Sequence, residues 1–275
     1  MEKKTAKKSG KSSTNRALSI LDLYTVTRPA WTVDEIHKEI GYARATIYRY
    51  IGELTDSGFL VGIAGARYVL GPRFIEFDRQ IRLTNPVIRV ASPLMKEIRN
   101  IVNGNQLLCS FYGDYVMTVY QDQKDSDVLP STSMERGRPF SLFRGAPSKI
   151  ILANLSNYQL KNVYLLHADD ILKEGLGQTW QEFLSNVQSI RRQGYWIGSE
   201  LDPELVGIAA PIFSEPGTIA GSLCLVRLRS KVSEKDLEML SELAVDTARS
   251  ISKNLQDWHL SNGTAAYVPS ARLIR

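Results

Sequence analysis

Apolar residues recur at helical spacing in three short segments that precede Gly58, and each segment predicts an amphipathic helix. In the second segment, Thr32 and Glu35 have the spacing of a capping box, in which each side chain accepts a hydrogen bond from the other residue's backbone amide. Gly41 stands where a left-handed residue commonly ends a helix. The three helices are expected at about Thr14–Val26, Thr32–Ile40 and Arg44–Ser57.

After the third helix, the spacing of apolar residues changes from helical to strand-like. Two short strands are expected to form a hairpin, Phe59–Val61 and Tyr68–Leu70. The helix expected after them, at Arg73–Leu83, has three large apolar residues on one side, Phe74, Phe77 and Ile81. This order of elements predicts a winged helix-turn-helix at residues 13–72 and a linker helix at residues 73–85.

The rest of the chain combines hairpins with helices. Gly113-Asp114 and Glu215-Pro216-Gly217 each lie between two apolar runs and predict tight turns. Strands are expected at Gln106–Tyr112, Tyr115–Gln121, Gly207–Ser214 and Ile219–Leu228. Helices are expected at about Val87–Ile101, Pro147–Leu155, Gln178–Gln193 and Ser233–Asp257. The pattern predicts an α+β domain with an antiparallel sheet at residues 86–258, followed by a tail at residues 259–275.

Length and charge add a second kind of information. The 275 residues fit two domains of ordinary size, and 43% hydrophobic residues suffice for their cores. Residues 1–16 hold six basic residues and one acidic residue, which equals the net charge of +5 of the whole chain. Residues 1–12 are therefore expected to form a disordered basic tail, which either adds phosphate contacts or is only a solvated terminus.

Several functional classes lack their signatures in this sequence. No apolar run approaches the roughly 18 residues of a membrane span, and the N-terminus has no signal-peptide core. The two distant cysteines form no disulfide framework or metal pattern, which fits a cytoplasmic protein. We find no nucleophile elbow, P-loop or dinucleotide fingerprint, and we expect a solvated loop after His167. We therefore expect no enzymatic activity, no cofactor and no metal site.

The third predicted helix has a face suited to reading DNA. Stepping about 100° per residue from a buried Ile47 leaves a solvent face of arginine, tyrosine and threonine with small residues between them. Arginine suits guanine edges or phosphates, threonine suits phosphates or thymine methyl groups, and alanine permits close approach. The candidate DNA-contacting residues are Arg44, Ala45, Thr46, Tyr48 and Arg49, together with Arg67 of the hairpin. A protein-interaction role for the same fold is the alternative.

Several segments, taken in order, carry a resemblance to a known family. They include Glu35-Ile-His-Lys-Glu-Ile-Gly41, Arg44-Ala-Thr-Ile-Tyr-Arg49, Lys149-Ile-Ile-Leu-Ala153, Ile190-Arg-Arg-Gln-Gly-Tyr195 and Ile208-Ala-Ala-Pro-Ile212. Their order and spacing resemble the IclR family of bacterial transcription regulators over residues 13–257. The resemblance implies a winged helix-turn-helix, a linker helix, a GAF-like effector-binding domain, and dimers or tetramers on palindromic operators. Ala43 and Gly52 depart from the family pattern, and Gly52 marks either a close approach to DNA or a tolerated defect.

In this family the effector pocket lies at the mouth of the C-terminal sheet, and the matching loop here precedes Pro147. Amide groups at a helix start favour anions, so the backbone of Gly145 and Ala146, with Arg144, is expected to hold the acid group of a metabolite. Family correspondence adds four residues, Asp202, Gly207, Ser222 and Cys224. A cysteine among them suits an aromatic or partly apolar acid. As alternatives, Arg144 is an ordinary surface residue, Cys224 belongs to the core, and Asp202-Pro203 is only a turn.

The sequence therefore favours a ligand-responsive transcription regulator. Its expected partners are double-stranded operator DNA, a small-molecule effector and further copies of the chain in a homodimer or homotetramer, with no membrane. Pairing of two linker helices through Phe74, Phe77 and Ile81 would bury side chains that a single helix leaves wet, unless they pack back on their own domain. The competing interpretation is a DNA-binding protein whose C-terminal domain only oligomerises. An enzyme with an appended DNA-binding domain lacks a catalytic constellation.

Overall fold

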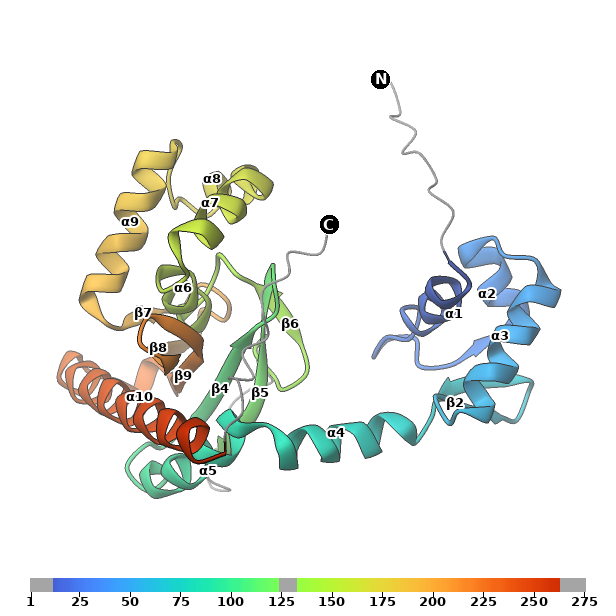
Figure 1. Ribbon diagram of the computed structural model, residues 1–275, viewed down its shortest axis with the longest axis horizontal. Helices are drawn as coiled ribbons and strands as arrows, with labels where there is room; N and C mark the ends of the chain where they lie inside the picture. The colour runs from blue at the N-terminus through green and yellow to red at the C-terminus, as the bar shows by residue number, and fades with distance from the viewer. Residues whose placement is uncertain (1–11, 124–132, 263–275) are drawn as a thin grey trace. The chain divides into compact units, whose positions relative to one another are not determined.

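The computed structural model describes residues 12–123 and 133–262 of the chain. These residues form two compact units, which divide between Ile81 and Arg82 (Figure 1). The expected basic tail, apart from its last residue, and residues 263–275 lie outside the described residues. Within the described parts, no helix combines the length and the apolar character that crossing a membrane requires.

The first unit is a winged helix-turn-helix. Its elements are α1 (Ser13–Leu21), β1 (Trp31–Thr32), α2 (Val33–Ile40), α3 (Arg44–Asp56), β2 (Leu60–Ile63) and β3 (Arg67–Leu70). The three strands form an antiparallel sheet in the order β1-β3-β2. The helices and the sheet enclose one apolar core, with Ile20, Ile36, Ile47 and Leu60 fully buried. Both the capping box of Thr32 and Glu35 and the left-handed Gly41 are confirmed.

The start of this unit differs from the prediction. Helix α1 ends at Leu21 rather than near Val26. Strand β1, which the sequence did not predict, pairs Trp31 with Tyr68, so the chain must leave the helix early to reach the sheet. The indole of Trp31 donates a hydrogen bond of 3.1 Å to the carbonyl of Leu23, which fixes the connection between α1 and β1.

Glycines at the base of the wing allow two backbones to touch. Gly58 ends α3 with a left-handed φ of 76°, and its carbonyl lies so close to Gly71 that a Cβ there would overlap it. Helix α4 (Arg73–Thr84) follows directly. The ring of Phe59 contacts those of Phe74 and Phe77, with centroids 5.4 and 5.9 Å apart. No residue of α4 is buried.

The second unit contains a six-stranded antiparallel sheet. Its strands are β4 (Asn105–Phe111), β5 (Tyr115–Gln123), β6 (Pro139–Ser141), β7 (Trp196–Gly198), β8 (Leu205–Glu215) and β9 (Thr218–Leu228), in the order β6-β5-β4-β9-β8-β7. The helices are α5 (Pro86–Ile98), α6 (Ala146–Ala153), α7 (Asn157–Leu166), α8 (Ala168–Lys173), α9 (Trp180–Gln193) and α10 (Glu234–Asn262). The predicted α+β fold with an antiparallel sheet is confirmed.

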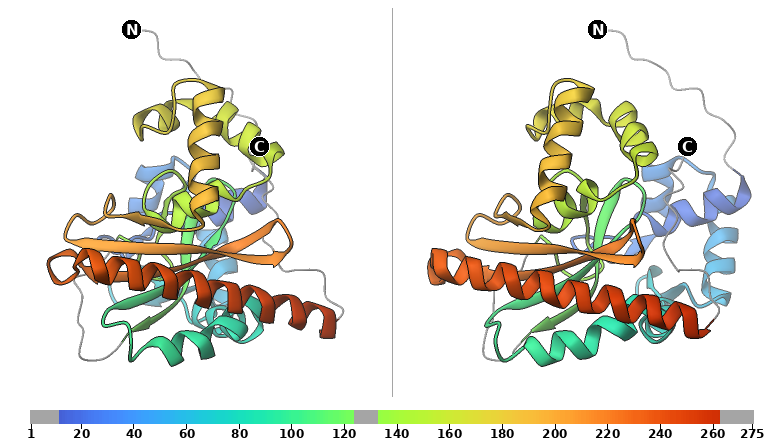
Figure 2. Two further views of the ribbon diagram at one scale, coloured as in Figure 1. Left: turned by 90° about the vertical axis from the view of Figure 1, so that its left-hand side faces the viewer. Right: turned by 60° about the vertical axis from the view of Figure 1, so that its left-hand side comes forward.

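Helices cover both faces of this sheet. Figures 1 and 2 show α5 and α10 on one side and α6 to α9 on the other. Each face has its own apolar core: Met95, Leu108 and Leu225 belong to the first, whereas Leu107 and Phe183 belong to the second. Every residue of α6 is buried, so the loop before it is held between the sheet and the other helices.

Two boundaries in this unit differ from the prediction. The segment around His167, expected to be a solvated loop, forms helices α7 and α8, and the His167 ring lies 5.4 Å from that of Phe143. A capping box of Ser156 and Gln159 starts α7. Helix α10 continues to Asn262, so residues 259–262, assigned to a tail, are helical.

Candidate DNA interface and effector pocket

Helix α3 presents the predicted solvent face. Ile47, Ile51 and Leu54 are buried together with Tyr50. Tyr48 is 60% exposed, Thr46 is half-buried, and the other predicted DNA-contacting residues on this helix, Arg44, Ala45 and Arg49, are exposed. The unit therefore has a packed inner face that fixes α3 and an outer face free to meet a groove.

The turn that aims α3 is held by a residue that the sequence did not single out. The amide of Gly41 donates to the carbonyl of His37, and the His37 ring nitrogen Nδ1 lies 2.7 Å from the carbonyl oxygen of Tyr42. Since a carbonyl only accepts, Nδ1 must carry the proton in this contact. His37 thus acts as a structural support of the turn between α2 and α3.

Arg44 and Arg49 each have an acidic neighbour on the surface. Arg44 Nε lies 2.6 Å from Asp34 Oδ1, and Arg49 Nε lies 3.9 Å from Glu53 Oε1. All four side chains are more than half exposed, and ion pairs of this kind stabilise a protein by less than about 1 kcal/mol. Exchange of either carboxylate for a DNA phosphate is therefore energetically easy.

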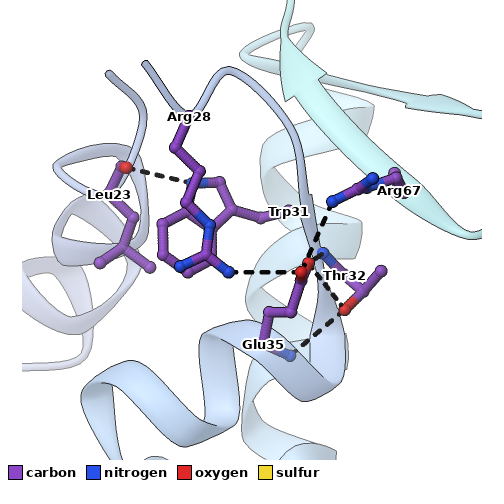
Figure 3. Close-up of polar contacts among 6 residues, drawn as sticks. All are labelled: Leu23, Arg28, Trp31, Thr32, Glu35 and Arg67. Atoms are coloured by element: carbon purple, nitrogen blue, oxygen red, sulfur yellow. Dashed lines mark hydrogen bonds and ion pairs between the residues drawn. The ribbon is translucent and has the colours of Figure 1, made fainter. Parts of the chain in front are cut away.

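Glu35 is the centre of a cluster that joins helix α2 to the wing (Figure 3). Its carboxylate accepts hydrogen bonds of 2.8 Å from the Thr32 amide and 3.0 Å from the Thr32 hydroxyl. It also lies 3.3 Å from Arg28 and 3.5 Å from Arg67. Arg28 in turn stacks on the Trp31 ring, 3.3 Å from its centroid. One carboxylate thus connects the chain before β1, the start of α2 and strand β3.

This cluster gives Arg67 a partner within the DNA-binding unit. Arg67 is the first residue of β3, directly after the hairpin tip formed by Ala64, Gly65 and Ala66, and its side chain faces Glu35. Arg28 was missed because its role arises only when Trp31 and Glu35 come together. Hydrogen bonds from Thr32 lower the pKa of Glu35, with smaller contributions from Arg67 and Arg28, so the carboxylate stays charged.

In the second unit, the predicted effector loop borders a small pocket. Gly145 precedes α6 with a φ of 90°, which favours glycine. The pocket is lined by Met134, Gly145, Ala146, Gly198, Ser199, Glu200, Leu201, Asp202, Leu205 and Gly207. Its free volume is about 10 Å³, enough for about one water molecule. The pocket therefore has no room for a metabolite in this conformation.

The predicted effector residues fall into two groups. Gly145, Ala146, Asp202 and Gly207 line the pocket together. Ser222 and Cys224 are fully buried on β9: the Ser222 hydroxyl donates to the carbonyl of Pro147, and the Cys224 sulfur lies beneath Gly207.

Arg144 does not line the pocket and has a different partner from the one expected. Its Nε donates a hydrogen bond of 2.8 Å to the backbone carbonyl of Glu200. On the same segment, the Asp202 carboxylate accepts hydrogen bonds of 3.1 Å from the Ser133 amide and 3.0 Å from its hydroxyl. Arg144 and Asp202 thus hold residues 199–202, which line the pocket.

The two thiols are poorly suited to chemistry. Burial raises the pKa of Cys109 to about 12, and burial with the neighbouring Cys109 raises that of Cys224 well above its usual value. Both therefore stay protonated and unreactive at neutral pH. Residues 12–123 and 133–262 contain no group of three metal-binding side chains.

A winged helix-turn-helix followed by an α+β sheet domain is the architecture of a DNA-binding transcription regulator with a C-terminal effector domain. Sequence comparison gives the particular family. The IclR helix-turn-helix domain matches residues 13–62, and the bacterial transcriptional regulator IclR C-terminal domain matches residues 83–253. The chain belongs to the IclR family, whose members are transcription regulators and not enzymes.

Known IclR-type regulators are similar to this chain in both sequence and fold. The chain is 24% identical to the HTH-type transcriptional regulator KipR of Bacillus subtilis over 87% of this chain and 95% of that one. An IclR regulator structure from Alicyclobacillus acidocaldarius has a TM-score of 0.72 at 21% identity, covering 88% of this chain and 98% of that one. An IclR homologue from Microbacterium hydrocarbonoxydans, complexed with 4-hydroxybenzoate, has a TM-score of 0.69 at 18% identity, covering 90% of this chain and all of that one.

Proposed function

We propose that this protein binds palindromic operator DNA in the bacterial cytoplasm as a homodimer or homotetramer, under the control of a small organic or aromatic acid. The observation that carries the DNA-binding part is the exposed face of α3, supported from behind by a packed core. Arg44, Ala45, Thr46, Tyr48 and Arg49 enter the major groove. Arg67 contributes at the wing, if a phosphate replaces Glu35 as its partner.

Assembly through α4 is the second part of the proposal. Phe74 is 37%, Ile81 is 49% and Ile75 is 71% exposed, and no residue of the helix is buried within a single chain. The ring of Phe77 packs partly on that of Phe59. For this one side chain, the contact supports the alternative that it packs against its own domain. A second copy of α4 would cover the remaining apolar side chains and set the spacing of two half-sites.

The effector part of the proposal assigns the acid to the pocket beside Gly145 and Ala146. Four of the seven predicted effector residues, Gly145, Ala146, Asp202 and Gly207, line this pocket. The 4-hydroxybenzoate complex of the Microbacterium homologue supports an aromatic acid as one ligand class. The pocket must open before such a ligand enters, because its free volume is only about 10 Å³.

Operator selection and release test the proposal. The full chain would be used to select its binding sites from random DNA, and footprinting would show whether two half-sites are protected. Arg49→Ala is expected to weaken specific binding by roughly 1–3 kcal/mol, the cost of removing one base contact. Arg192→Ala removes the same charge from α9 in the other unit and serves as the control.

The competing function, a C-terminal domain that only oligomerises, gives a different result in the same assay. Small carboxylic acids would be added to the operator complex, and the change in affinity measured. We expect at least one acid to change operator affinity through the effector unit. An operator complex that ignores all acids, while remaining dimeric and specific, would favour the purely oligomerising domain.

A further inference from the structure

Lys149 and Glu200 form an ion pair at the candidate effector pocket. Lys149 Nζ is 2.6 Å from Glu200 Oε1, and the side chains are 11% and 30% exposed, respectively. Lys149 belongs to α6, whereas Glu200 follows β7 and lines the pocket. An ammonium group this far from water needs a negatively charged partner, and Glu200 supplies it.

The surroundings of the ion pair are suited to an acid with an apolar body. Lys149 Nζ lies 5.3 Å from the centre of the Trp196 ring, within range of a cation–π contact. Glu200 Oε2 and Trp196 Nε1 are both buried, and a hydrogen bond from Trp196 helps to lower the pKa of the Glu200 carboxylate. A buried cation, an indole N–H and an aromatic face together recognise a carboxylate attached to an apolar group. The Glu200 carboxylate occupies the place of that anion.

Glu200 also holds the pocket closed. Lys149 binds its carboxylate and Arg144 binds its backbone carbonyl, so the residue is fixed at two points. The next residue, Leu201, packs so closely on Gly145 that a Cβ at Gly145 would meet its side chain. Burial by itself raises the pKa of Glu200, but the hydrogen bond and charge of Lys149, together with hydrogen bonds from the Glu200 backbone and from Trp196, bring the pKa below its usual value. The carboxylate is therefore charged and remains paired.

We infer that Glu200 is an internal substitute for the effector's carboxylate, and that a monocarboxylate with an apolar or aromatic body displaces its side chain, pairs with Lys149 and frees residues 199–202. This inference rests on the effector-binding function proposed above. Exchange of one carboxylate for another leaves Lys149 with a partner throughout, so no buried charge is stranded. The displaced Glu200 side chain moves into water, where its charge is solvated.

Glu200→Gln provides the main test, because it keeps the shape of the side chain and removes its charge. It leaves the Lys149 ammonium without an anion, so circular dichroism first establishes that the variant is folded. Titration calorimetry would compare the full wild-type chain, this variant and Glu204→Gln, a control with the same charge change at an exposed position in the neighbouring loop. The probes are benzoate and acetate, with benzamide and acetamide as neutral analogues. Benzoate is expected to bind E200Q at least ten-fold more tightly than wild type, whereas E204Q and the amides show no gain. Equal benzoate affinity, or no binding of either acid, overturns the inference.

Lysine variants test the other half of the exchange. Lys149→Met alone strands the Glu200 carboxylate and can lose stability, so the double variant K149M/E200Q, which removes both charges, is the informative one. It should bind benzoate no better than benzamide. A retained preference for benzoate in a folded double variant, as judged by circular dichroism, contradicts the role of Lys149.

A measurement without ligand keeps this inference separate from the proposed function. Hydrogen exchange at residues 196–205 should be faster in E200Q than in wild type or E204Q, because the variant removes one of the two attachments of this segment. Unchanged exchange overturns the closing role of Glu200 even if acids release the operator. Operator binding that ignores acids, with exchange and benzoate affinity altered as expected, overturns effector control and leaves the exchange of carboxylates standing.

Discussion

At the scale of single residues, two glycines show how the backbone angle decides the effect of the same substitution. Gly41 and Gly52 both have open space where a Cβ would stand. Gly41 ends α2 with a φ of 73°, whereas Gly52 lies in the middle of α3 with ordinary helical geometry. Space alone would predict that alanine is tolerated at both positions. Only Gly52 has a backbone conformation that alanine adopts without strain, because the φ of Gly41 is left-handed.

We expect Gly52→Ala to stabilise the DNA-binding unit by about 1 kcal/mol, because alanine is favoured over glycine inside a helix by that amount. Gly41→Ala, the matched control, should destabilise it by ~1 kcal/mol, the cost of a left-handed non-glycine residue. Urea titration of the full chain, followed by pulsed hydrogen exchange in α2 and α3, separates the two effects. Operator affinity should not change in G52A; a large loss would indicate that the backbone approaches DNA at this position.

Glu35 gives the DNA-binding unit a predictable response to acid. Its pKa is lowered in the folded chain, so its contribution to stability is complete above the unfolded value, 4.5, and is lost as pH falls through the folded value. Glu35→Gln retains a capping box but removes the charge that attracts Arg28 and Arg67.

Hydrogen exchange at residues 28–41, corrected for its intrinsic pH dependence, should therefore change less between about pH 6 and about pH 3 in E35Q than in wild type, with most of the wild-type change below the unfolded value of 4.5. Asp56→Asn, which neutralises an exposed carboxylate at the end of α3, is the control. If wild type and E35Q respond equally to acid, the carboxylate of Glu35 does not organise the wing.

At the scale of elements, features that depend on residues close in the sequence could be predicted, whereas features that depend on distant residues could not. The start and end of α2 follow from Thr32, Glu35 and Gly41, which are close in the sequence and act on their own helix. Strand β1 has only two residues and exists because Trp31 pairs with Tyr68, far along the chain. No local pattern announces such a strand, and the early end of α1 follows from it.

At the candidate effector pocket, too, contacts between residues far apart in the sequence could not be predicted. Gly145 and Ala146 were predicted because a loop that enters a helix is visible in the sequence and matched a family position. Lys149 and Glu200 are 51 residues apart, and only the packing of α6 behind the segment after β7 brings them together. The role of Arg144 was also invisible, since its partner is a backbone carbonyl rather than a side chain.

Helix α4 provides a prediction at this scale. Phe77→Glu should convert a dimer to monomer, because it places a charge in the apolar side of α4 that we propose pairs with a second copy. Light scattering measures the mass, and Arg79→Glu, an exposed position of the same helix, is the control. A retained dimer in F77E would mean that the aromatic side chains serve only their own domain, as the Phe59–Phe77 contact allows.

At the scale of the whole molecule, the charge that attracts DNA is separate from the surface that reads it. Residues 12–81 contain eight basic and eight acidic residues, so the DNA-binding unit is neutral. The net charge of +5 is already present in residues 1–16, mostly outside the described residues. We therefore expect non-specific attraction to come from that segment, and sequence preference to come from the side chains proposed on α3.

Replacing Lys3, Lys4, Lys7, Lys8 and Lys11 by alanine should flatten the dependence of operator affinity on salt. For every phosphate that the variant no longer neutralises, the slope of log K against log salt falls by roughly 0.9. The selected operator sequence should not change, which fluorescence anisotropy with matched and mismatched DNA would establish. A loss of sequence preference in this variant would place the reading surface in the tail rather than on α3.

The exposed apolar side chains of α4 have a consequence for how much of the protein a cell must make. A helix of twelve residues without a buried side chain is marginal on its own, so the assembly proposed above would also stabilise α4. If two copies pair through α4, folding of the linker and assembly are one equilibrium, governed by protein concentration. We then expect regulation to be sensitive to gene dosage, because halving expression would lower both the number of regulators and the fraction able to span two half-sites.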